Sequence, residues 1–175
     1  MKTNFTLRFE LKDLEFWAEK YSYPGEELVM HEISPQIQQH QFITPEQLVT
    51  LCNWKSPRIR TRCAANDPEF IKSVTHTAFT TSNERLRIEI LTLLSGVGWP
   101  MASVLLHWGH TDPYPILDFR ALWSLGVDVL PRYNFEFWWA YTQQCRLLAQ
   151  EAAVSMRTLD RALWQYSKEH QGKDD

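Results

Sequence analysis

The sequence lacks an excess of positive charge and any long apolar run. Of its 175 residues, 18 are Lys or Arg and 21 are Asp or Glu, so the formal net charge is −3. Such a chain lacks the overall basic footprint of a tight non-specific nucleic-acid binder, although a local basic stripe is enough for phosphate contact. No segment approaches the roughly 18 apolar residues of a membrane span, and the start has no signal-peptide-like run. We therefore expect a soluble, cytoplasmic protein with no membrane partner.

A metal or iron–sulfur cysteine pattern is also absent. The three cysteines, Cys52, Cys63 and Cys145, are odd in number and widely spaced, and match neither kind of motif. We expect reduced thiols, as in a cytosolic compartment, and neither a metal site nor a cofactor.

Helical patterns cover nearly the whole chain, and no segment alternates as a strand does. Start signals recur at Thr44-Pro45, Asp67-Pro68 and Asn83, where a capping side chain precedes apolar residues at helical spacing. The expected helices are 11–21, 26–39 (interrupted by Pro35), 44–54, 67–79, one from Ser82 or Asn83 to 94, 100–108, 118–125, 134–152, and one from Ser155 or Thr158 to 170. With 44% hydrophobic residues, the chain (1–175) is expected to be one compact all-α domain.

Two glycines separate the helices expected at 83–94 and 100–108, in Leu94-Ser95-Gly96-Val97-Gly98-Trp99-Pro100. Glycine tolerates positive φ and lets another backbone approach, so such a turn leaves N–H groups uncovered. The free donors and the dipole at the start of the next helix favour an anion, such as a phosphate. The same pattern also fits a plain helix–helix turn with a glycine C-cap.

One acidic residue, Asp118, follows Gly98 by twenty residues, in Tyr114-Pro115-Ile116-Leu117-Asp118. An Asp before a short apolar helix is a good N-cap, which is a purely structural role. Its apolar neighbours favour partial desolvation, which sharpens the electrostatic effect of a carboxylate. The capping role and a catalytic role are compatible.

In this order and spacing the two elements resemble the helix-hairpin-helix superfamily of DNA glycosylases, nearest its adenine glycosylase and endonuclease III branch. Leu94-Ser95-Gly96-Val97-Gly98, followed by Ala102, is similar to the family's hairpin, and Pro115-Ile116-Leu117-Asp118 is similar to its catalytic loop. The resemblance covers a core of about 44–168. It implies a compact helical bundle containing a helix-hairpin-helix motif.

By this resemblance the hairpin grips DNA, duplex or single-stranded, while one nucleotide is flipped out of the stack. Asp118 then stabilises the positive charge that grows on the sugar as the N-glycosidic bond breaks, or positions an attacking water. The resemblance also implies a monovalent cation at the hairpin.

The chain departs from the family pattern at Pro100. Relatives that also cut the DNA strand carry a lysine at this position, and proline has no amine for a Schiff base. Trp99 stands where many relatives have a basic or polar residue, and the four-cysteine iron–sulfur cluster is absent. The resemblance therefore implies a monofunctional glycosylase that leaves an abasic site.

The candidate DNA contacts come from the hairpin, from the basic run Lys55–Arg62 and from the loop before Asp118. The basic run also fits a solvated face, and most aromatics fit a core. Trp99 and Tyr114 are placed to stack on a flipped base or to wedge the duplex. The predicted contacts are Gly96, Val97, Gly98, Trp99, Met101, Lys55, Arg58, Arg60 and Tyr114.

Three functions follow from these patterns. The first is a monofunctional DNA glycosylase with Asp118 as its catalytic residue. The second is a non-catalytic nucleic-acid-binding domain that uses Asp118 only as a helix cap. The third, favoured by the acidic balance, is a helical interaction protein without a nucleic-acid partner.

Overall fold

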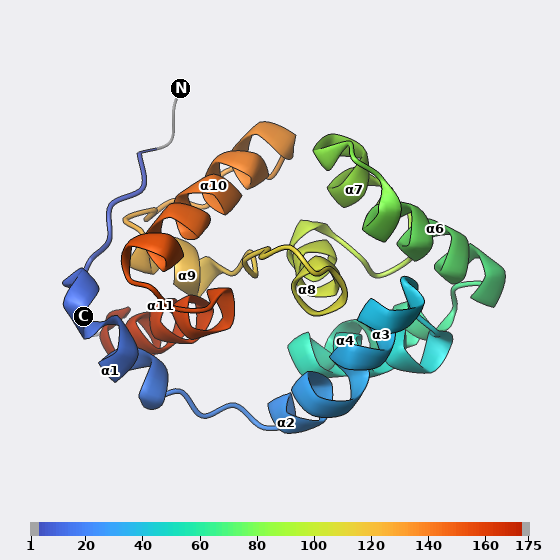
Figure 1. Cartoon of the computed structure of the whole chain (residues 1–175), viewed down its shortest axis with the longest axis horizontal. Coiled ribbons are helices and arrows are strands. Elements are labelled where there is room, and N and C mark those ends of the chain that lie inside the picture. The colour runs from blue at the N-terminus through green and yellow to red at the C-terminus, as the bar shows by residue number, and fades with distance from the viewer. Residues whose placement is uncertain (1–3, 173–175) are drawn as a thin grey trace. The chain divides into compact units, whose positions relative to one another are not determined.

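The computed structural model describes residues 4–172, and all the regular structure in that range is helical (Figure 1). The all-α prediction is therefore confirmed. None of these helices is both long enough and apolar enough to cross a membrane.

The chain divides into two compact units. The central unit comprises residues 23–113, and the terminal unit comprises residues 1–22 and 114–175. The expected core of 44–168 takes helices from both units. The single-domain assignment and the helix-hairpin-helix motif stay predictions.

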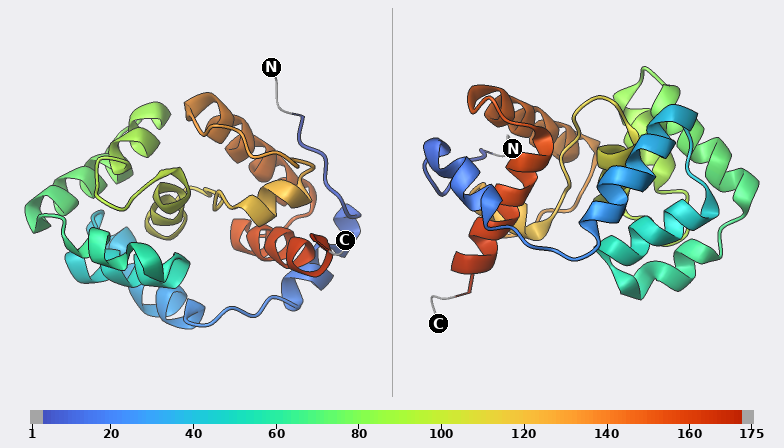
Figure 2. Two further views of the ribbon diagram at one scale, coloured as in Figure 1. Left: turned by 180° about the vertical axis from the view of Figure 1, so that it is seen from behind. Right: turned by 60° about the horizontal axis from the view of Figure 1, so that its bottom comes forward.

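The central unit contains α8 (Trp99–Gly109) and the helices around it: α2 (Glu26–Leu28), the π-helical turn η2 (Val29–Ile33), α3 (Ser34–His40), α4 (Pro45–Lys55), the 3-10 turn η3 (Pro57–Ile59), α5 (Arg60–Ala64), α6 (Pro68–Thr80) and α7 (Glu84–Leu91). Nearly all of α8 is buried, and it contacts α3, α4, α6 and α7. Figure 2 shows these helices from two further directions. An all-round apolar helix belongs in a core, and α8 forms the core of this unit.

Local capping sets where these helices begin. Thr44 and Gln47 form a reciprocal capping box at the start of α4. Asp67 and Asn83 each accept a backbone N–H from the third residue of α6 and α7. These starts are as predicted, and Pro35 lies in the first turn of α3 instead of breaking a helix. Helix α5 was not predicted, because the basic run gave no capping signal.

The terminal unit is organised around α11 (Met156–His170). Its other elements are η1 (Leu11–Asp13), α1 (Leu14–Glu19), α9 (Phe119–Ser124) and α10 (Phe135–Glu151), and all three α-helices contact α11. Figure 1 shows α1 beside α11. The backbone N–H of Thr6 also donates to the carbonyl of Leu125 at 2.9 Å. Segments from opposite ends of the sequence thus pack around one helix.

A disulfide joins Cys52 on α4 to Cys63 on α5, and Cys145 is a free, buried thiol. The expectation of three reduced thiols was therefore wrong for this pair. The two cysteines are 11 residues apart, and the short η3 turn between the helices brings their α-carbons within 6.8 Å. That reversal of chain direction is not visible in the cysteine spacing.

We expect one reactive thiol per chain when the unreduced protein is unfolded in guanidinium and titrated with Ellman's reagent, because only Cys145 is unpaired. Reduction before unfolding should raise the number to three. In the folded protein Cys145 should react slowly, because burial raises the pKa of its thiol well above the usual range and the thiolate is the nucleophile. Three thiols without reduction would contradict the disulfide.

Candidate functional site

The segment between α7 and α8 contains the glycine turn, residues 95–98. Gly96 has φ +84°, in the left-handed region that side chains rarely adopt. A Cβ there would lie 3.0 Å from Cys63 Sγ and 3.2 Å from the Cys63 backbone nitrogen. Both the conformation and the close approach of α5 therefore require glycine at position 96.

The side chain of Asn66, just after α5, holds the glycine turn. Its Nδ2 donates to the carbonyl of Ser95 at 2.9 Å, and its Oδ1 accepts from the Ser95 N–H at 2.7 Å. The Val97 N–H donates to the carbonyl of Leu94 at 3.0 Å. Two of the turn's four N–H groups are thus used within the central unit, and the turn is fixed to α5.

Gly98, unlike Gly96, has a conformation and surroundings that accept a side chain. Its backbone is extended, with φ −91° and ψ −177°, a conformation open to any residue. The nearest atom to a Cβ built there is Cδ of Pro100, at 4.0 Å. Gly98 caps α8 without a side chain and is exposed. Neither conformation nor packing requires glycine at position 98.

The other predicted hairpin contacts are less accessible. Val97 and Met101 are 4% and 3% exposed, so their side chains belong to the core. A contact with DNA at these two positions would have to use the backbone. Trp99 and Pro100 are half-buried in the first turn of α8.

The basic run reaches the glycine turn at its last residue, Arg62. Arg58 is on η3 and Arg60 on α5, both exposed, and Lys55 at the end of α4 is half-buried. A Cβ on Gly96 would lie 3.2 Å from Cβ of Arg62, which is also exposed. The structure thus places one end of the basic run beside the glycine turn, and the roles predicted for Lys55, Arg58 and Arg60 stay predictions.

Asp118 opens α9 in the terminal unit. Its Oδ1 accepts the backbone N–H of Arg120 at 2.9 Å, so the expected capping role is present. The carboxylate is half-buried, and the four residues before it, 114–117, are buried. Asp118 therefore lies where a buried irregular segment meets a short helix.

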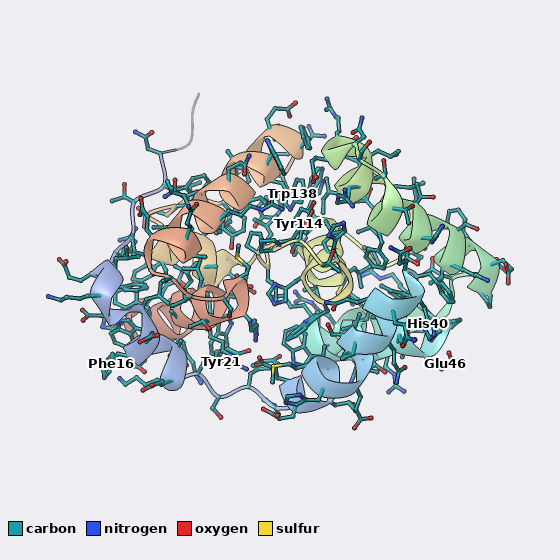
Figure 3. The ribbon with its side chains drawn as sticks, viewed as in Figure 1. Phe16, Tyr21, His40, Glu46, Tyr114 and Trp138 are labelled. Atoms are coloured by element: carbon teal, nitrogen blue, oxygen red, sulfur yellow. A yellow bond between two sulfur atoms is a disulfide. The ribbon has the colours of Figure 1, made fainter. Side chains whose placement is uncertain are left out.

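Tyr114 has a packing role. The ring of Tyr114 stacks on that of Trp138, with centroids 5.8 Å apart. The guanidinium of Arg146 lies 4.7 Å from the centroid of the Tyr114 ring, and Trp138 and Arg146 are both on α10. Figure 3 labels Tyr114 and Trp138 in this cluster. Only 1% of Tyr114 is exposed. Stacking on a flipped base, the role predicted for Tyr114, would require the ring to leave Trp138.

Tyr133, which the sequence analysis did not single out, is electrostatically coupled to Asp118. Burial raises the pKa of its phenol first, and the negative charge of Asp118 raises that pKa further. Tyr133 is half-buried, and its ring lies 5.9 Å from that of Phe137 at the start of α10. No local signal points to this residue, because a loop of eight residues separates it from α9.

The two candidate elements belong to different units: the glycine turn to the central unit and Asp118 to the terminal unit. Within residues 4–172, no group of three or more His, Cys, Asp or Glu side chains is arranged to hold a metal ion. Comparisons with protein-family models, with curated proteins and with solved structures found no match. The function is therefore argued from the chemistry of these residues.

The two glycines give a matched pair of substitutions. Gly96→Ala should lower the free energy of unfolding by more than about 1 kcal/mol, because the left-handed conformation and the contact with Cys63 both oppose a side chain. Gly98→Ala should lower it less, by about 0.5 kcal/mol, because alanine is a weaker N-cap than glycine but meets no steric conflict there. Urea unfolding followed by circular dichroism measures both. An equal loss in the two variants would show that the contrast between the glycines is wrong.

Asp118→Asn should lower the pKa of Tyr133 toward its ordinary value, because it removes a negative charge that opposes the phenolate. Alkaline titration of tyrosinate absorbance measures this, with Tyr133→Phe used to assign the signal. The expected change is an earlier onset of Tyr133 ionisation as pH rises. An unchanged titration curve would mean that Asp118 is not close to Tyr133.

Proposed function

We propose that this chain binds DNA through the glycine turn and α5, and removes a damaged or modified base by hydrolysing its N-glycosidic bond at Asp118. The observation that supports this most is the contrast between Gly96 and Gly98. The fold requires the first glycine, whereas the second leaves the N-terminus of α8 without a side chain, at a position that serine, threonine, aspartate or asparagine would cap at least as well. A bare helix N-terminus of this kind suits an approaching phosphate.

The donors to such a phosphate are the remaining N–H groups of the turn, at Gly96 and Gly98, since those of Ser95 and Val97 are used internally. Arg62, exposed on α5 and adjacent to Gly96, supplies positive charge close to the turn, and Arg58 and Arg60 precede it in the same basic run. A local basic face is sufficient for a salt-dependent grip on a DNA backbone.

Asp118 supplies the negative charge that the chemistry needs. As the bond between the base and C1′ breaks, its electron pair leaves with the base, and the sugar becomes a cation resembling an oxocarbenium ion. A fixed carboxylate beside C1′ stabilises that cation or orients the water that adds to it. The water's oxygen then bonds to C1′, one proton is transferred to the leaving base, and an abasic sugar remains.

The chain has no group for strand cleavage at the position where the resemblance would place it. Pro100, in the first turn of α8, has no amine to form a Schiff base with the opened sugar. The proposed activity is therefore monofunctional.

The capping bond between Asp118 and Arg120 favours a second candidate, a DNA-binding domain without catalysis. In that function Asp118 serves only to begin α9. The two functions share the glycine turn and differ at Asp118, so a substitution that keeps the cap separates them.

Asp118→Asn should reduce base release at least about 100-fold and leave DNA binding within about twofold, because asparagine caps a helix as well as aspartate does but carries no charge. The substrates are duplex and single-stranded oligonucleotides carrying a panel of modified bases. Free base is measured by mass spectrometry, and abasic sites by alkaline strand cleavage. Asp67→Asn is the matched control, since Asp67 caps α6 in the same way.

Two further results decide between the functions. Wild-type protein that releases no base from the whole panel, but binds DNA with an affinity that falls steeply with salt, would establish the non-catalytic function. In either case Gly98→Ala should weaken binding with only about 0.5 kcal/mol loss of stability. Absent or salt-independent binding would leave only an interaction protein.

A further inference from the structure

The peptide groups of Ile116, two residues before Asp118, are held on both sides by buried side chains from other helices. The Ile116 N–H donates to the carboxylate of Asp160 on α11, with both oxygens 3.3 Å from the nitrogen. The Ile116 carbonyl accepts the hydroxyl of Tyr141 on α10 at 2.8 Å. Asp160 and Tyr141 are 4% and 0% exposed. One irregular residue is thus fixed through both its donor and its acceptor.

The chain is held on the other side of Asp118 as well. Ser124, the last residue of α9, donates its hydroxyl to the carbonyl of Leu163 on α11 at 2.6 Å. Asp118 itself caps α9 through the Arg120 N–H. The candidate catalytic residue therefore lies between two anchors, both of which reach α11.

The hydroxyl of Tyr141 keeps its proton at any ordinary pH. Burial, and then the nearby Cys145 and Asp160, raise the pKa of this phenol well above its usual range, and Asp118 adds to the effect. The donor to the Ile116 carbonyl is therefore permanent under working conditions.

We propose that Asp160 and Tyr141 are positioning residues, which hold the Ile116 peptide so that the Asp118 carboxylate stays in one place for the reaction. This rests on the proposed function. A fixed charge stabilises a transition state only if it is already in position, and an error of about 1 Å costs on the order of 100-fold in rate. Neither residue touches the substrate in this scheme, and each acts through the backbone.

The first test is kinetic and uses a substrate found in the base-release panel. Tyr141→Phe and Asp160→Ala should lower kcat about 10- to 100-fold with KM within about twofold, because positioning and not binding is lost. Asp160→Asn should restore most of kcat, since its amide oxygen still accepts the Ile116 N–H. Ser34→Ala is the control, because it removes a comparable buried bond, from Ser34 Oγ to the Trp108 carbonyl, in the central unit.

The second test does not depend on activity and uses Tyr133 as a reporter of where Asp118 lies. In Tyr141→Phe and Asp160→Ala the Tyr133 titration should move toward that of Asp118→Asn, and in Ser34→Ala it should stay at the wild-type position. Circular dichroism at each pH checks the fold. A wild-type titration in the first two variants would overturn the positioning role, as would a kcat lowered no more than in Ser34→Ala.

Failure of the proposed function has a different signature. If the wild-type protein releases no base, the glycosylase proposal fails, and the Tyr133 titration alone decides whether Asp160 and Tyr141 fix Asp118. If base release occurs and the titration does not move, only the positioning role fails.

Discussion

Backbone that is not helical cannot pair its polar groups within a helix, and in both candidate elements side chains remote in sequence supply the partners; before Asp118, where the backbone is buried, such partners are obligatory. An unpaired buried N–H or carbonyl costs about as much as a lost hydrogen bond. At the glycine turn, one asparagine, Asn66, satisfies both polar groups of Ser95. Before Asp118, two side chains, Asp160 and Tyr141, satisfy both polar groups of Ile116. The bonds to Ile116 make an irregular backbone possible in the core, and the same bonds fix it in place.

The constraint also explains why the two glycines of the turn are not equivalent. Gly96 lies where α5 approaches closely, so a side chain at this position would destabilise the fold. Gly98, two residues further along the chain, is the N-cap of α8, and its extended conformation suits any residue. Conformation and packing therefore both require glycine at position 96, whereas position 98 requires only a residue that can begin α8.

Features that depend on residues close in sequence could be predicted, whereas features that depend on residues far apart in sequence could not. Helix starts at Thr44, Asp67 and Asn83 depend on residues three positions apart, so local pattern was sufficient for the caps and for the all-α fold. The partners that fix the site are remote in sequence: Asn66 lies 29 residues from Ser95, and Asp160 lies 44 residues from Ile116. No periodicity reports such pairs. Tyr114 was placed on an accessible loop for the same reason, since its burial depends on Trp138 in another helix.

The interactions that hold each element lie wholly within its own unit. Asn66, Cys63 and the glycine turn belong to the central unit, whereas Ile116, Tyr141 and Asp160 belong to the terminal unit. The capping bond from the Arg120 N–H is one of the interactions that fix the carboxylate of Asp118. The cap holds the carboxylate in place, which the structural role and the proposed catalytic role both require. Because the glycine turn and Asp118 belong to separate units, substitutions can test the proposed role of each while the interactions that hold the other stay in place.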